Sequence, residues 1–143
     1  MFFKNTVDFG SRTLLTAINQ LALTNTDFKK ILDVGCGYGP LGLALAKKNA
    51  TLNQLTNVKI WASNIYQQVS ASDYDLIISN PPIRAGKKVV QKIITEAGEH
   101  LKSQGQLIIV IQKSRVLLQQ KNSWKPFLDK PKFYCDRKVI MFC

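Results

Sequence analysis

The 143-residue sequence has few of the residues that build disulfide frameworks, zinc sites or membrane spans. Its three cysteines are odd in number and show no CxxC spacing, and His100 is the single histidine, which excludes an ordinary disulfide framework and a four-ligand zinc site. No apolar run exceeds five residues, as in Leu107–Ile111, whereas a membrane-spanning helix needs about 18. The first residues show no basic start leading into an apolar region, so no secretory signal is expected. We therefore predict a cytoplasmic protein with no membrane partner and no metal.

Acidic residues are also scarce. Twenty Lys and Arg residues stand against nine Asp and Glu residues, which gives a net charge of +11. Residues 1–83 carry a net charge of +2 and residues 84–143 a net charge of +9. An imbalance of this size in a small domain favours a polyanionic partner that binds the C-terminal half. A solvated basic surface without a partner is the alternative.

The order of hydrophobic patterns predicts one α/β domain over residues 1–143. Helices are expected at Ser11–Leu23, from Pro40 to about Leu55, and from Val89 to near Gly105. Strands are expected at Lys30–Val34, Val58–Trp61, Asp75–Ser79 and Gln106–Ile111, with short closing strands at Lys132–Cys135 and Lys138–Phe142. The alternation of strands and helices indicates a mostly parallel sheet flanked by helices, completed by a C-terminal antiparallel hairpin.

Three alternate glycines follow the first predicted strand, at Gly35, Gly37 and Gly39. Glycines at this place let the backbone turn sharply and let a ligand approach main-chain N–H groups at a helix start. The same stretch satisfies the dinucleotide fingerprint from Gly37 to Gly42, so a nicotinamide cofactor has to be considered. Asp33 favours another ligand, because a carboxylate at the strand end repels pyrophosphate and suits a cation such as the amino group of S-adenosylmethionine.

A second motif, Asn-Pro-Pro-Ile at residues 80–83, follows the strand predicted at Asp75–Ser79. In a parallel sheet it lies at the same carboxyl edge as the glycines. The lone pair of an aromatic exocyclic amine is delocalised into its ring, so a catalyst must orient the amine. The Asn80 amide oxygen and the Pro81 carbonyl can each accept one amine N–H and so aim the lone pair. A simple strand-terminating turn is the alternative.

Three segments, Val7–Arg12, Ile31–Gly42 and Asp75–Lys87, together resemble the small-domain methyltransferases related to bacterial small-subunit rRNA guanine-N2 methyltransferases. The resemblance implies a Rossmann-like fold, S-adenosylmethionine as donor and an exocyclic guanine amine of rRNA as acceptor. It implies that the cofactor is bound by Asp33 and by the loop residues Gly35, Cys36, Gly37 and Gly39. It also implies a lid segment at Asp8, Gly10 and Ser11, and a target-base motif at Asn80, Pro81, Pro82 and Ile83.

The sequence departs from this pattern after the first glycine-loop helix. From Val34 to Ser72 it contains no Asp or Glu, although such a fold places an acidic residue at the end of a second strand to hold the cofactor ribose. A strand-helix unit is therefore predicted to be missing. Asn64 matches the later acidic position that contacts the adenine amine, and its amide oxygen can accept that hydrogen bond.

These observations predict an S-adenosylmethionine-dependent N-methyltransferase acting on guanine in rRNA or a ribosomal subunit. The expected phosphate-binding residues are Arg84, Lys87 and Lys88. Two alternatives stay open: a catalytically impaired RNA-binding remnant of the fold, and a protein-glutamine N-methyltransferase. Redox chemistry with NAD is less well supported, because it explains neither the Asn-Pro-Pro motif nor the absent ribose acid.

Overall fold

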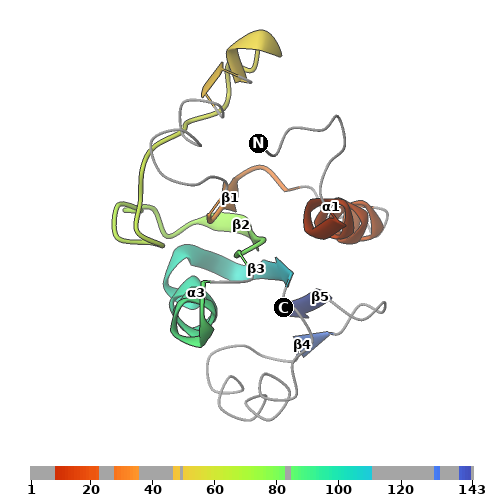
Figure 1. The fold of residues 1–143 in the computed structure, drawn as a ribbon, viewed down its shortest axis with the longest axis vertical. Coiled ribbons are helices and arrows are strands. Elements are labelled where there is room, and N and C mark those ends of the chain that lie inside the picture. The colour runs from red at the N-terminus through yellow and green to blue at the C-terminus, as the bar shows by residue number, and fades with distance from the viewer. Residues whose placement is uncertain are drawn as a thin grey trace.

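The structure, a computed structural model, describes residues 9–22, 28–35, 47–48, 50–82, 85–110, 131–132 and 139–142. Its elements follow the chain in the order α1 (Phe9–Ala22), β1 (Ile31–Asp33), β2 (Tyr74–Ser79), α3 (Lys87–His100), β3 (Leu101–Val110), β4 (Pro131–Lys132) and β5 (Val139–Phe142). A sheet lies between the two helices, with α1 and α3 on opposite faces (Figure 1). In the described parts of the chain, no helix is long and apolar enough to cross a membrane.

The five described strands form one sheet in the order β1-β2-β3-β5-β4. The first three run parallel, with Asp33 level with Ile78 and Ile78 level with Ile108. Strand β5 runs antiparallel to both β3 and β4. The α/β class, the parallel core and the closing antiparallel pair are therefore confirmed. Residues 133–138, where the turn of that hairpin was expected, lie outside the described residues.

Each face of the sheet carries its own hydrophobic core, because side chains along a strand alternate between faces. On one face, α3 contributes residues at helical spacing, Val90, Ile93, Ile94 and Ala97, which pack against the strands. On the other face, α1 contributes Leu14 and Ala17, which pack with Leu76, Ile108 and Val110. Every strand residue from Leu107 to Ile109 is fully buried, so β3 is sandwiched between the two helices.

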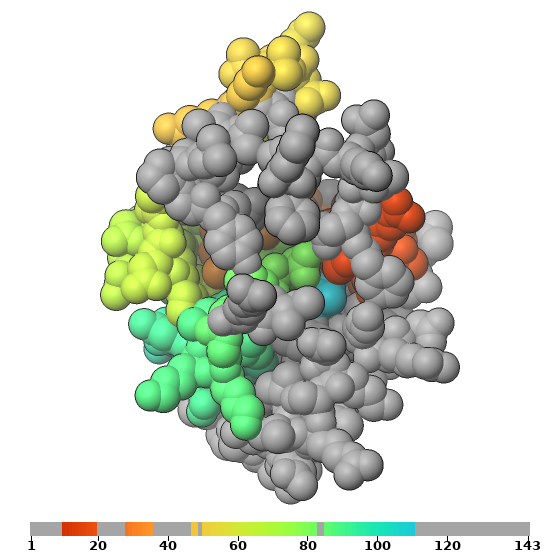
Figure 2. All heavy atoms as spheres, viewed as in Figure 1, coloured from red at the N-terminus to blue at the C-terminus, as the bar shows by residue number. Residues whose placement is uncertain are grey.

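The segment between β1 and β2 differs from the prediction. Residues 58–61 are not a strand, and the described stretch 53–73 contains turns and irregular backbone only. A strand needs a neighbour to bond its backbone and a core to bury its side chains. Around residues 58–61, four large apolar side chains are exposed: Leu52, Leu55, Val58 and Trp61. Figure 2 shows the beginning of this region in yellow at the top of the molecule, whereas its later residues, in yellow-green, lie beside the green atoms of α3.

The helix predicted from Pro40 to about Leu55 is described only in part. Residues 47–48 and 50–52 are helical, and residues 36–46 lie outside the described residues. Among the described strands, β1 is paired on one side only, by β2. No strand is described between residues 50 and 73 that takes its other edge.

The irregular segment before β2 is held by a small aromatic cluster rather than by strand pairing. The buried Tyr66 hydroxyl donates a hydrogen bond to the Ile93 carbonyl of α3, with a distance of 3.0 Å. Burial, with a further contribution from the nearby Glu96 charge, raises the pKa of Tyr66 above its usual range. The Tyr66 ring also stacks on His100, whose Nδ1 lies 2.9 Å from the Ala71 carbonyl oxygen. This cluster fixes residues 66–71 against the α3 face.

A buried carboxylate joins the beginnings of three strands. Asp75 Oδ2 accepts hydrogen bonds from the backbone N–H groups of Lys29 and Lys30 at 3.0 and 2.7 Å, just before β1. The other oxygen of Asp75 forms an ion pair with Lys102 of β3. Because backbone and side-chain donors together satisfy it, this buried charge fixes β1 against β2 at the edge opposite to the Asn-Pro-Pro motif.

Candidate active site at the carboxyl edge of the sheet

The two sequence motifs meet where β1 and β2 end. Pairing continues one residue past β1, since the Val34 N–H donates to the Ile78 carbonyl at 2.9 Å. The fully buried Ser79 hydroxyl then donates to the Val34 carbonyl at 2.7 Å. Gly35 and Asn80 follow these two paired residues directly, so the first glycine and the asparagine leave the sheet at the same edge.

Gly35 begins the turn that leaves β1. Its φ of +86° lies in a region that residues with a side chain rarely adopt, and no atom of the other described residues, its chain neighbours aside, lies within 4 Å of the position that a Cβ would occupy. Among the described residues, no side chain therefore covers this backbone. The remaining residues of the predicted cofactor loop, Cys36, Gly37 and Gly39, lie outside the described residues.

Asp33 is the last residue of β1 and is exposed at its surface. The protein atoms around its carboxyl nevertheless remove enough bulk water to raise its pKa from 3.8 to about 6. Water still reaches the carboxyl, which limits the energetic cost of ionisation, and above pH 7 the carboxylate form predominates. A cationic ligand placed beside this carboxyl would favour its ionised form, so the ionised Asp33 is suited to bind a cation.

This pKa shift predicts a pH-dependent stability. The unfolded chain keeps the ordinary pKa of Asp33, so between about pH 4 and pH 6 the folded protein binds more protons than the unfolded chain. The contribution of Asp33 to the free energy of unfolding is present below this window and is lost as the pH rises through it. We therefore expect Asp33→Asn to raise the free energy of unfolding relative to the natural chain at pH 7.5 and not at pH 4, as measured by urea denaturation.

Asp73→Asn is the matched control for this measurement, because Asp73 is an exposed carboxylate in a surface ion pair with Lys30. Such pairs contribute between zero and about 1 kcal/mol. A difference between the natural chain and Asp33→Asn that stays constant from pH 4 to pH 7.5 contradicts the raised pKa.

Asn80 follows β2 and its side chain is half-buried. It contacts the beginning of α1, where Asn80 Nδ2 donates a hydrogen bond to Ser11 Oγ at 3.4 Å. A Cβ at Gly10 would lie only 2.5 Å from Asn80 Oδ1. The family resemblance implied that Gly10 and Ser11 belong to a lid over the cofactor, and the structure brings both of them against Asn80. Asp8, the remaining residue of that segment, lies outside the described residues.

The loop after Asn80 is compact. Pro81 and Pro82 are half-buried, and the Ala85 N–H donates to the Pro82 carbonyl at 2.8 Å, which closes the turn that leads into α3. Proline fixes its own φ angle, so two successive prolines hold the direction in which the chain leaves Asn80. Ile83, the expected base-packing residue, lies outside the described residues.

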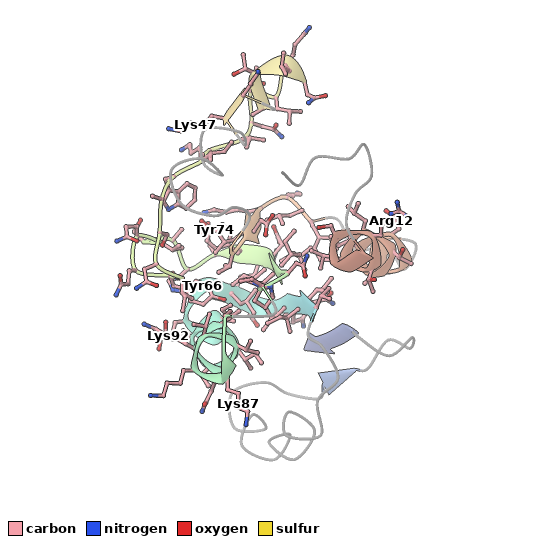
Figure 3. All side chains as sticks on the ribbon, in the orientation of Figure 1. Arg12, Lys47, Tyr66, Tyr74, Lys87 and Lys92 are labelled. Atoms are coloured by element: carbon pink, nitrogen blue, oxygen red, sulfur yellow. The ribbon has the colours of Figure 1, made fainter. Side chains whose placement is uncertain are left out.

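Basic side chains stand at the beginning of α3, close in sequence to this loop. Lys87 and Lys88 are exposed, and Figure 3 shows Lys87 and Lys92 pointing outward from α3, away from the sheet. Arg84 and the basic residues between positions 111 and 130 lie outside the described residues.

The structure keeps Asn64 apart from these contacts. It is exposed, and its backbone N–H donates to Gln68 Oε1 at 3.0 Å within its own turn. Sequence reasoning did not find Ser79, nor the contact of α1 with Asn80. Within the described ranges, no group of three or more His, Cys, Asp or Glu side chains could hold a metal ion.

Comparisons with known proteins identify relatives in sequence and in fold. In sequence, the chain is 43% identical over 137 residues to the uncharacterized protein YbxB of Bacillus subtilis, covering 80% of this chain and 66% of YbxB. It is 31% identical over 134 residues to ribosomal RNA small subunit methyltransferase C of Vibrio vulnificus, covering 77% of this chain and 37% of that protein. The chain thus spans less than two thirds of the length of these relatives.

In structure, the fold matches the Thermus thermophilus 16S rRNA N2 G1207 methyltransferase RsmC, solved in complex with AdoMet and guanosine, with a TM-score of 0.76. This match covers 99% of the chain and 44% of RsmC at 20% identity, so it shows a shared fold. The model of the methyltransferase small domain family matches residues 1–55 and 43–123. The chain belongs to the methyltransferase small domain family.

Proposed function

We propose that the chain transfers a methyl group from S-adenosylmethionine to an exocyclic guanine amine of rRNA. The observation that carries this proposal is the placement of Asn80 at the carboxyl edge of the sheet, level with the Gly35 backbone. The names of the methyltransferase relatives and the RsmC complex support it. An rRNA or ribosomal-subunit substrate is found in the cytoplasm.

The described residues at this edge fit the cofactor. Asp33 offers a carboxylate whose charged form is destabilised by partial desolvation and would be stabilised by the cationic end of S-adenosylmethionine. Gly35 offers backbone that no side chain of the described residues covers. S-adenosylmethionine, when bound, supplies an electrophilic methyl group on a sulfonium.

The protein's own contribution to transfer is the orientation of the target amine. Asn80 Oδ1 and the Pro81 carbonyl accept the two N–H groups of the exocyclic amine, so that its lone pair points at the methyl carbon. As positive charge develops on the nitrogen, the same two oxygens stabilise it. No general base is needed before attack, and the proton leaves to water afterwards. Arg84, Lys87 and Lys88 bind phosphates of the RNA backbone near this loop.

We also propose that a strand-helix unit is absent between the glycine-loop helix and residue 50. Three observations support this. The family model matches the chain in two stretches that overlap at residues 43–55. The alignment with YbxB is 137 residues long but covers only 80% of the 143 residues of this chain. The alignment therefore contains gaps where YbxB has residues that this chain lacks. Among the described strands, β1 is paired only by β2. Without the ribose carboxylate that this unit carries, we expect cofactor affinity to be about a hundredfold lower.

The experiment that tests the proposed function combines cofactor titration with methyl transfer. Calorimetry with S-adenosylhomocysteine should show binding in the micromolar range or weaker, and tritiated methyl groups should appear in unmodified small-subunit rRNA. The missing acidic residue favours one second candidate, an RNA-binding remnant without catalysis. Salt-sensitive RNA binding in the absence of both cofactor binding and methyl transfer would decide for the remnant.

A further inference from the structure

The beginning of α1 forms a close-fitting seat for the Asn80 side chain. The position of a Cβ at Gly10 lies 2.5 Å from Asn80 Oδ1, 2.7 Å from Nδ2 and 2.9 Å from Cγ. Separations below 3.0 Å do not occur for real Cβ atoms, so the whole amide group occupies space that only glycine leaves empty. Ser11, the next residue, accepts a hydrogen bond from Asn80 Nδ2 at 3.4 Å.

This contact restrains the rotation of the amide. The terminal χ2 torsion of asparagine has a broad range, so the hydrogen bond from Asn80 Nδ2 to Ser11 Oγ narrows the orientations that the amide adopts beside Gly10.

The seat is attached to the strand that carries Asn80. From α1, Leu14 and Ala17 are buried in the same cluster as Leu76 of β2 and Ile108 of β3. Because α1 packs on β2 through these side chains, the positions of Gly10 and Ser11 relative to Asn80 are set by the core rather than by a flexible loop. Preorganisation of this kind is what a positioning group needs in order to raise a rate.

We propose that Gly10 and Ser11 are positioning residues: Gly10 makes room for the Asn80 amide, and Ser11 restrains the orientation of that amide through a hydrogen bond. This inference rests on the proposed function and assigns the beginning of α1 to the substrate side of the reaction. It makes a different prediction from a cofactor lid, because a lid acts on cofactor affinity and a seat acts on the rate of transfer.

The test compares Ser11→Ala with Ser11→Thr, which keeps the hydroxyl, and with Thr16→Ala. Thr16 is the matched control, since its exposed hydroxyl on the same helix bonds the Arg12 carbonyl at 3.0 Å. We expect Ser11→Ala to lower kcat about tenfold with the KM for S-adenosylmethionine within twofold, as the loss of one hydrogen bond predicts. Ser11→Thr and Thr16→Ala should keep kcat within twofold. An increase in KM at unchanged kcat for Ser11→Ala would overturn the proposal in favour of a cofactor contact.

A second measurement makes the result independent of activity. In the ¹⁵N-labelled chain of 143 residues, the two side-chain amide protons of Asn80 should shift and exchange faster in Ser11→Ala, and stay unchanged in Thr16→Ala. If the natural chain methylates no rRNA while these signals respond as expected, the proposed function fails and the seat stands. If the Asn80 signals do not respond to Ser11→Ala, the seat is refuted whatever the activity.

Discussion

Asn80→Ala is expected to lower methyl transfer to rRNA by about 10²- to 10³-fold, the range measured when one preorganised hydrogen-bonding group is removed from a reacting centre. The substitution removes the acceptor that orients the amine and leaves the Pro81 carbonyl in place. Cofactor binding should stay within twofold, because Asn80 acts on the acceptor side. Single-turnover transfer of tritiated methyl groups measures the first quantity, and calorimetry with S-adenosylhomocysteine measures the second.

The control for this variant is Asn57→Ala, the same substitution at an exposed asparagine away from the sheet edge. It should leave both rate and binding unchanged. Thermal unfolding has to accompany the assay, because Asn80 is half-buried and a loss of about 1 kcal/mol lowers the Tm by several degrees. A rate for Asn80→Ala within threefold of the natural chain would remove Asn80 from the reaction and with it the proposed mechanism.

The convergence of the two motifs could be predicted from sequence because it depends on topology alone. Gly35 and Asn80 each follow a short apolar strand in an alternating strand-helix order, and parallel strands end at one edge. The buried face of α3 could also be predicted from the sequence, because its buried residues recur at helical spacing: Val90, Ile93, Ile94 and Ala97. Hydrophobic periodicity and the topology of parallel sheets were sufficient to predict the shared edge of the two motifs and the buried face of this helix.

The prediction of a strand at residues 58–61 was wrong, because hydrophobic periodicity does not show whether a neighbouring strand is present. Val58 and Ile60 alternate with polar residues as a half-buried strand would, but a strand exists only if a neighbour pairs with it. Among the described residues, no strand pairs with residues 58–61, and the side chains of Val58 and Trp61 are exposed. The absence of acidic residues from Val34 to Ser72 already pointed to the same region.

Contacts between distant segments were beyond sequence reasoning. Ser11 and Asn80 are 69 residues apart, and helical periodicity shows which face of α1 is buried without showing which strand end it meets. In the sequence, Ser79 is a polar residue before a predicted turn. Its neighbours in sequence do not indicate that it is fully buried and that its hydroxyl donates to the Val34 carbonyl. Asp75 likewise reads as an ordinary strand residue, although it bonds the backbone before β1.

Gly10→Ala should separate stability from activity, which makes it the sharpest test of how the site is built. Gly10 lies in α1 at a helical φ, so alanine suits its backbone and the free energy of unfolding should stay equal or rise by up to about 1 kcal/mol. The new methyl group cannot share space with the Asn80 amide, which has to rotate out of its seat, and we expect kcat to fall about a hundredfold.

Gly98→Ala, the same change at an exposed position of α3, should give the gain in stability with unchanged kcat. Urea denaturation and single-turnover transfer measure the two quantities, and natural kcat in Gly10→Ala would show that Asn80 works without its seat.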